Sequence, residues 1–169
     1  MRNWLFLMLL SSVTGCMGVP DGVEPVKGFE VERYVGKWYE IARLENRFEK
    51  GLEKITAEYS PREDGGLNVV NRGFDPAKDR WKESSGKAYF VGPRDEGRLK
   101  VTFFWPFYGA YNVILLDEAY QWALVCGPDR SYLWILARTP TLPEPTLKRL
   151  IAEAKARGFA TDELIYVKQ

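Results

Sequence analysis

The stretch that decides the fold is Gly36-Lys37-Trp38-Tyr39-Glu40-Ile41-Ala42-Arg43. It predicts a strand, because aromatic and aliphatic residues follow a turn residue. Side chains alternate between the two faces of a strand, so Trp38 and Glu40 share the inward face. A lone inward carboxylate is unfavourable. We therefore expect Glu40 to have a partner, such as an arginine or a tyrosine, or the strand to contain a bulge.

Seven similar runs follow this strand, and turn residues such as Gly127-Pro128-Asp129 separate them. The predicted strands cover residues 37 to 45, 54 to 60, 67 to 73, 80 to 91, 98 to 104, 110 to 116, 120 to 126 and 131 to 138. Eight sequential strands with short links predict an all-β fold, an eight-stranded antiparallel up-and-down barrel. A closed barrel of this size has room for one small ligand.

One amphipathic helix is predicted after the strands. Its apolar side recurs at helical spacing through Leu147, Leu150, Ile151 and Ala154. Thr141 and Glu144 precede it at the spacing of a capping box, and Gly158 stands in the stop position. We expect this helix to pack on the outside of the barrel, and a final strand at residues 164 to 167 to pair with an edge.

The N-terminus has the layout of a secretory signal. Arg2 precedes an apolar run at residues 4 to 10, which is far shorter than the roughly 20 residues that span a bilayer. Val13-Thr14-Gly15-Cys16 resembles the bacterial lipobox, whose cysteine receives a diacylglycerol before cleavage. We expect a signal peptide at 1–15, a lipidated Cys16 with a flexible tether at 16–30, and one domain at 31–169. The alternative is an ordinary cleaved signal with a chance cysteine.

Two features of the tether bear on location. Residues 17 to 28 contain glycine and proline without periodicity, and a dozen extended residues reach roughly 40 Å. In lipoproteins of this kind, an acidic residue after the cysteine favours the inner membrane. Met17 stands there instead. The expected location is therefore the outer membrane, with the lipid-anchored domain on its periplasmic face.

The composition disfavours several classes of function. The chain has 24 basic and 23 acidic residues and no histidine. The absence of a basic stripe argues against nucleic-acid binding. Histidine-dependent nucleophiles and Cys/His metal clusters are impossible, while acidic pairs remain as conceivable acid/base groups. No cofactor and no metal are expected. Once Cys16 is acylated, Cys126 is the remaining thiol and no internal disulfide can form.

Three blocks carry a family resemblance. Gly36-Lys37-Trp38-Tyr39 is similar to the Gly-x-Trp signature of the lipocalins. The stretch from Tyr111 to Tyr120 resembles their second block, with Asp117 in place and Leu116 where threonine is common. Arg138 matches the arginine of the third. The whole domain resembles bacterial lipocalins, which are outer-membrane lipoproteins. The resemblance implies a barrel that binds hydrophobic ligands and is not an enzyme.

The meander itself predicts how one end of the barrel closes. Alternate links return to the same end, so Arg138 at the end of the eighth strand should lie beside Trp38. A guanidinium over an indole is worth about 0.5 to 2 kcal/mol. We interpret Gly36, Trp38, Asp117 and Arg138 as structural residues that do not touch the ligand.

The ligand site is expected toward the open end. Side chains on the inward face of the eighth strand line the cavity, and an aromatic link after the fifth strand lies at the mouth. Exposed aromatic residues mark a binding or membrane-facing surface, although packing over neighbouring loops would also account for them. Arg72, Arg130 or Tyr132 would meet a head group. The predicted ligand-binding residues are Tyr132, Trp134, Leu136, Trp105, Phe107, Tyr108, Tyr111 and Arg130. Which face of Tyr111's strand lines the cavity is open.

The predicted function is to bind, store or transport fatty acids or lysophospholipids. A structural or interaction role in the envelope is the alternative, and a homodimer is possible. A third hypothesis is an enzyme that uses Cys126 as nucleophile. It is weak, because no histidine lowers the usual thiol pKa of about 8.5.

Overall fold

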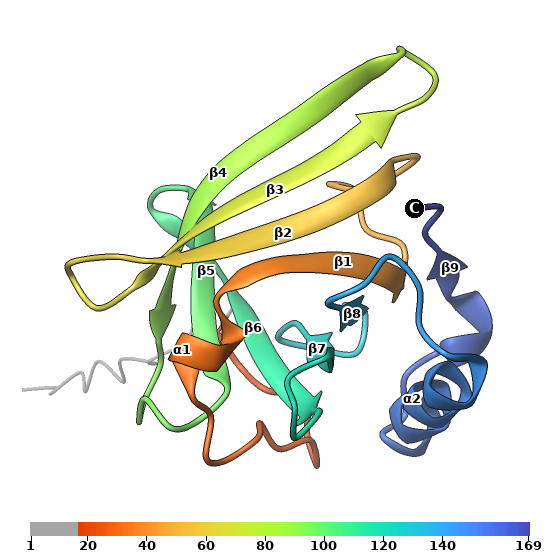
Figure 1. Cartoon of the computed structure of the whole chain (residues 1–169). Helices are drawn as coiled ribbons and strands as arrows, with labels where there is room; N and C mark the ends of the chain where they lie inside the picture. The colour runs from red at the N-terminus through yellow and green to blue at the C-terminus, as the bar shows by residue number, and fades with distance from the viewer. Residues whose placement is uncertain (1–16) are drawn as a thin grey trace, which may run out of the picture.

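The computed structural model describes residues 17 to 169, so the predicted signal peptide and Cys16 lie outside the described residues. Eight antiparallel strands form a closed barrel, as predicted (Figure 1). Strand β1 pairs with both β2 and β8 and so closes the sheet. The barrel strands are β1 (Gly36–Arg43), β2 (Glu53–Pro61), β3 (Leu67–Asp75), β4 (Arg80–Phe90), β5 (Arg98–Phe104), β6 (Phe107–Leu116), β7 (Trp122–Cys126) and β8 (Leu133–Ala137).

The seam between β1 and β2 is only partly paired. The two strands pair as far as Tyr39 and Thr56 and then separate. Beyond this point the short strand β9 (Ile165–Tyr166) pairs with the end of β1. The side-chain amide of Gln169 donates to the backbone carbonyls of Glu40 at 2.6 Å and Ile55 at 3.1 Å. The C-terminal residues therefore fill the gap that the two diverging strands leave.

In the part of the chain that the structure describes, two helices and one short 3-10 turn accompany the barrel. Helix α2 (Glu144–Ala156) packs outside it through Leu150 and Ala154, as predicted. The predicted capping box at Thr141 is wrong, because the N-cap residue is Pro143 and no side chain caps the helix. No periodic pattern in the sequence predicts α1 (Val31–Tyr34), a single turn at the closed end. The 3-10 turn covers Thr161–Glu163. No helix within residues 17 to 169 is long and apolar enough to cross a membrane.

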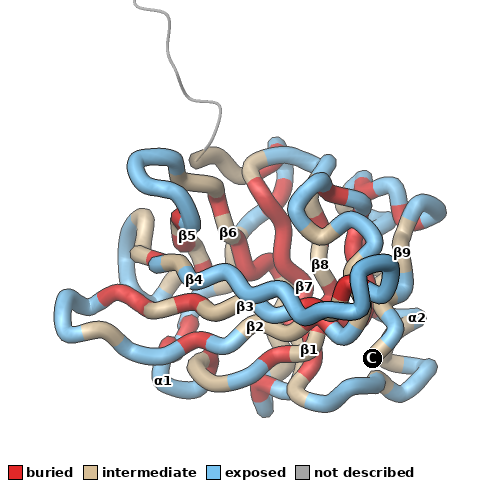
Figure 2. Tube along the Cα trace, turned by 90° about the horizontal axis from the view of Figure 1, so that it is seen from above, coloured by how far each residue is buried: buried red, intermediate tan, exposed pale blue. Residues whose placement is uncertain are grey.

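Figure 2 marks the buried residues in red. They form two groups, one inside the barrel and one between the barrel and α2. The inner group includes Trp38, Val113 and Leu136. The outer group includes Ile135 and Leu150. Because successive side chains of a strand point to opposite faces of the sheet, neighbours such as Ile135 and Leu136 belong to different groups. This alternation fixes which side chains can reach a ligand inside the barrel.

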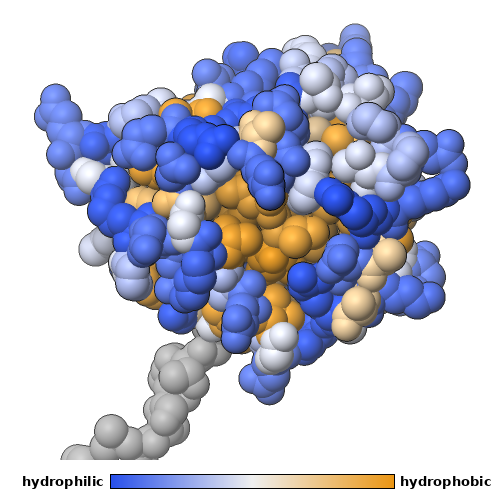
Figure 3. Space-filling view, turned by 60° about the horizontal axis from the view of Figure 1, so that its bottom comes forward, coloured by the Kyte–Doolittle hydropathy of each residue, from blue (hydrophilic) through white to orange (hydrophobic). Residues whose placement is uncertain are grey.

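The segment before α1 is packed against the barrel and is not the free tether that its glycines and prolines predicted. Val23 is only 6% exposed. The backbone N–H of Val26 donates to the Val113 carbonyl at 2.8 Å, and the Asn112 amide donates to the Gly18 carbonyl at 3.1 Å. On the lower side of Figure 1, where this segment runs, hydrophobic residues fill the middle of the face and hydrophilic residues surround them (Figure 3).

Candidate functional site

The closed end of the barrel is built around Arg138 and Trp38. The guanidinium carbon of Arg138 lies 3.9 Å from the centre of the Trp38 ring, so the predicted contact is present. Trp38 is fully buried, and its indole N–H donates to the Tyr34 carbonyl at 2.8 Å. The guanidinium also donates to five backbone carbonyls, those of Arg33, Tyr34, Val35, Lys37 and Tyr120. Arg138 therefore joins α1 to the barrel and closes this end.

The other predicted structural residues lie at the same end. Gly36 has a φ of +97°, and a Cβ there would lie 3.3 Å from Nη1 of Arg138. Both the backbone conformation and the close approach favour glycine. The Asp117 carboxylate accepts the backbone N–H of Gln121 at 3.1 Å and so orders the turn between β6 and β7.

Three tyrosines form a hydrogen-bonded chain inside the barrel. The Tyr111 hydroxyl lies 2.7 Å from the Tyr34 hydroxyl and 2.9 Å from that of Tyr59. Burial raises the pKa of all three phenols above the usual value of 10, so they stay protonated at neutral pH. Tyr111 and Val113 thus face inward, which answers the question that the sequence left open. A register shift between Val113 and Leu115 then reverses the alternation.

A buried ionic group lies further along β1, toward the open end. Without a bulge, Glu40 and Arg43 would face opposite sides of the sheet, since they are three residues apart. The register of β1 against β8 shifts between Glu40 and Ala42, and Arg43 pairs with Trp134. Oε1 of Glu40 lies 3.5 Å from Nη1 of Arg43. The expectation of an arginine partner or a bulge at Glu40 is confirmed on both counts.

A third charged residue, Glu49, reaches this group from the segment between β1 and β2. Its carboxylate accepts the indole N–H of Trp134 at 3.0 Å and the side-chain amide of Asn46. The backbone carbonyl of Glu49 accepts a hydrogen bond from Arg43 at 2.8 Å. Burial first and the neighbouring Glu49 second raise the pKa of Glu40 well above its usual value. Sequence reasoning missed Glu49, because the direction of a loop side chain has no periodic signal.

The predicted residues of β8 and the preceding link divide into two sets. Leu136 and Trp134 belong to the interior group, and the Tyr132 ring stacks on Trp134 at 6.0 Å. The predicted role of Arg130 as a head-group contact is wrong. Its guanidinium donates to the carbonyls of Arg157, just beyond α2, and Asp21, and both lie outside the barrel.

The aromatic link between β5 and β6 is a tight hairpin whose tip is exposed. Trp105 is 78% exposed and Phe107 is 74% exposed, while Phe104 beside them is 80% exposed. Tyr108 is half-buried, and the Lys100 ammonium lies 4.7 Å from the centre of its ring. The tip therefore presents three aromatic rings to its surroundings instead of packing them on neighbouring loops.

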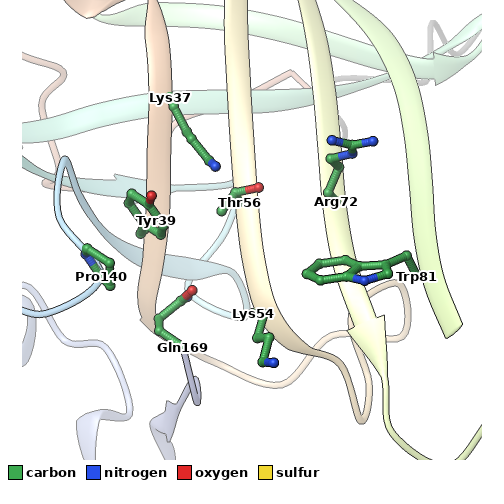
Figure 4. A pocket seen from close by; sticks show the side chains of 8 residues that line it. All are labelled: Lys37, Tyr39, Lys54, Thr56, Arg72, Trp81, Pro140 and Gln169. Atoms are coloured by element: carbon green, nitrogen blue, oxygen red, sulfur yellow. The ribbon is translucent and has the colours of Figure 1, made fainter. Parts of the chain in front are cut away.

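A groove of about 390 Å³ lies on the outer face of β1 to β4 (Figure 4). It contains three cations, and each already has a partner. Arg72 forms an ion pair with Glu83 at 2.7 Å. Lys37 and Lys54 lie over the rings of Tyr39 and Phe74. Arg72 is thus on the outer face, since it shares the register of Thr56 and Tyr39, and the prediction that it meets a head group at the mouth is wrong. The lining residues are Lys37, Tyr39, Lys54, Thr56, Arg72, Trp81, Pro140 and Gln169.

Cys126 lies in the outer group, between the barrel and α2. Its side chain is fully buried, and burial raises the pKa of the thiol to about 12. A thiolate is therefore scarce at neutral pH, and nucleophilic chemistry needs the thiolate.

Known proteins resemble the chain in both sequence and fold. The sequence model of the protein family described as the lipocalin-like domain matches residues 29–169. The outer membrane lipoprotein Blc of Vibrio cholerae is 53% identical over 167 residues, 98% of this chain and 98% of that protein. The outer membrane lipoprotein Blc of Citrobacter freundii is 55% identical over 150 residues, 89% of this chain and 85% of that protein.

Solved structures support the same assignment at the level of the fold. Insecticyanin from the tobacco hornworm Manduca sexta superposes with a TM-score of 0.71 at 19% identity, over 90% of this chain and 87% of that one. Lipocalins with this fold are typically carriers of ligands. From the matched domain and the two bacterial relatives, the chain belongs to the lipocalin family and is a lipid-anchored lipoprotein of the outer membrane.

Proposed function

We propose that this lipocalin binds, stores or transports single-chain amphiphiles, namely fatty acids or lysophospholipids, inside its barrel. The observation that carries the proposal is the make-up of the interior. Apolar side chains such as Leu136, Val113 and Trp134 line it, and a small buried ionic group lies toward the open end. An acyl chain against such a surface gains about 25 cal/mol for each Å² buried.

The predicted ligand-binding residues now have separate roles in the proposal. Trp134, Leu136 and Tyr111 face the interior and contact the ligand. Tyr132 extends this lining through its stack on Trp134. The exposed tip with Trp105, Phe107 and Tyr108 guides the amphiphile toward the mouth.

Titration of the delipidated protein with oleate and with oleoyl lysophosphatidylcholine tests this function. Binding should change the fluorescence of Trp134, and Trp134→Phe identifies the signal as coming from that residue. Mass spectrometry of the small molecules that copurify with the protein gives a second readout. Unchanged fluorescence, together with a mass spectrum that contains no copurifying small molecule, would refute the carrier function.

The anchor is the second part of the proposal. We assign the lipid to Cys16, the last residue before the described chain, with residues 1–15 as the signal peptide. Radiolabelled palmitate should label the wild-type protein and leave Cys16→Ser unlabelled. A homodimer remains a prediction, which sedimentation of the purified protein tests.

A purely structural role in the envelope makes a different prediction from the carrier. Substitutions that fill the barrel, such as Val113→Phe, should abolish a carrier phenotype and leave a structural one intact. We also propose that this protein is not an enzyme, and the buried Cys126 thiol with its raised pKa supports this part of the proposal.

A further inference from the structure

Arg43 is the one arginine side chain among the fully buried residues of the described chain, and it has unused donors. Its side chain is 2% exposed. Its Nη2 donates to the Glu49 carbonyl, but Nε and Nη1 have no hydrogen-bond partner among the described residues. Oε1 of Glu40, 3.5 Å from Nη1, is also without a hydrogen bond. A buried polar atom without a partner costs about 1 to 3 kcal/mol, so this arrangement calls for an explanation.

The geometry around Arg43 suits an acidic group. A guanidinium offers a planar fork of donors that fits a carboxylate or a phosphate in a bidentate manner. Two further donors, the Trp134 indole N–H and the Asn46 amide, point at the same place, because both bind the Glu49 carboxylate. Oε2 of that carboxylate lies 3.9 Å from Nε of Arg43. Three unlike donor groups from three parts of the chain therefore surround one acidic side chain.

Glu49 is held there by a segment that can release it. The side chain of Asn46 orders this segment by accepting the backbone N–H groups of Phe48 and Glu49, both at 3.1 Å. The exposed ring of Phe48, 68% accessible, lies at its tip. The Glu49 side chain itself is 17% exposed, unlike Glu40 and Arg43. Its carboxylate can thus move into water while the two residues of β1 stay buried.

We propose that Arg43 binds the acidic head group of the amphiphile inside the barrel, and that Glu49 occupies the head-group position until the ligand displaces it. This inference rests on the proposed carrier function and specifies its ligand as anionic. The exchange keeps the charge balance, since one acid replaces another beside a buried cation. That balance matters because a buried charge without a partner is strongly destabilising.

The protonation of Glu40 supports this arrangement. Burial and the nearby Glu49 favour the neutral form of Glu40. A neutral Glu40 leaves Glu49 as the one acidic side chain beside Arg43 that a ligand has to replace. The expected ligands have a carboxylate or a phosphate monoester on one chain.

Head-group preference tests the inference directly. The mature lipoprotein in phosphatidylcholine nanodiscs is titrated with oleate, oleoyl lysophosphatidate and oleyl alcohol, which share a chain and differ in the head group. The wild type should bind the two acids about tenfold more tightly than the alcohol. Glu49→Gln keeps an acceptor for Trp134 but removes the competing charge, so it should bind oleate about tenfold more tightly than the wild type and the alcohol as before.

Arg43→Met should bind oleate no better than the alcohol. Arg72→Met, which removes an arginine from the outer face, is the matched control and should keep the preference. If Arg43→Met does not fold, the Glu49→Gln variant still tests the inference. An affinity of this variant for oleate equal to that of the wild type overturns the inference. Equal binding of acids and alcohol by the wild type also overturns it while leaving the carrier function intact. Failure of all three ligands to bind would instead refute the carrier function.

Discussion

The guanidinium carbon of Arg138 lies 3.9 Å above the centre of the Trp38 ring, and its nitrogens reach the carbonyls at the end of α1. The two residues stand 100 positions apart in the sequence, so their contact joins the first and last strands of the barrel. One side chain therefore links these two strands and holds α1 at the closed end.

We predict that Arg138→Lys lowers the free energy of unfolding by about 2 kcal/mol, because an ammonium cannot reach several carbonyls at once. Urea unfolding followed by tryptophan fluorescence measures the change. Arg149→Lys is the control, since Arg149 lies over the Trp122 ring at 4.8 Å on the outer surface. This control substitution should lower the free energy of unfolding by only about 0.5 kcal/mol. Equal costs would mean that the closed end has no special role.

Tyr111→Phe should destabilise the protein by about 1 to 3 kcal/mol, because it leaves two buried hydroxyls without their partner. Tyr34→Phe should cost less, since Tyr111 keeps its bond to Tyr59. Thermal unfolding of the two variants compares them. A larger loss for Tyr34→Phe would show that Tyr111 is not the central member of the chain.

Glu40 should make stability depend on pH. Its pKa is raised in the folded protein above the usual 4.5, so the folded state binds more protons than the unfolded state between these two values. The free energy of unfolding should therefore fall as the pH rises above 4.5 through that window. Glu40→Gln should flatten this slope, as urea titrations at a series of pH values would show. A slope unchanged by the substitution would assign the dependence to another group.

Trp105→Ser should slow the uptake of oleate from vesicles and leave the stability within about 0.5 kcal/mol, because the side chain is exposed. Stopped-flow fluorescence gives the rate. Trp81→Ser removes a similarly exposed tryptophan from β4 and should leave the rate unchanged. Identical rates for all three proteins would remove the hairpin tip from the proposed path.

Cys126→Ala should leave ligand affinity unchanged. In the folded wild type, the thiol should react with a disulfide reagent far more slowly than in urea, because it is buried with a raised pKa. Absorbance of the released thiolate follows the reaction. Fast labelling of the folded protein would contradict the described burial.

The closed end could be predicted from the sequence, whereas most of the ionic group could not. Trp38 and Arg138 are recognisable in their motifs, and the topology of a meander brings them together. The position of Arg43 depends on a bulge, which arises from pairing between β1 and β8. The segment that presents Glu49 has no repeating pattern. Its one local signal is Asn46, whose side chain often stabilises turns by accepting backbone N–H groups.

The packing of the N-terminal segment against the barrel could not be predicted from the sequence either. Val19, Val23 and Val26 are separated by glycines, prolines and acids, and such spacing predicts no regular element. They are nevertheless packed, because Val19 and Val23 join the outer group of buried residues and Val26 lies against the inner group.

That packing also determines how far the domain can travel. With the lipid on Cys16, a single peptide link of about 3.8 Å joins the anchor to a residue that already touches the barrel through Arg98. The barrel cannot cross the roughly 40 Å that a loose arm would allow. In the proposed carrier function, amphiphiles would therefore be exchanged with the leaflet that holds the anchor's acyl chains, and delivery to a distant membrane would need a second carrier.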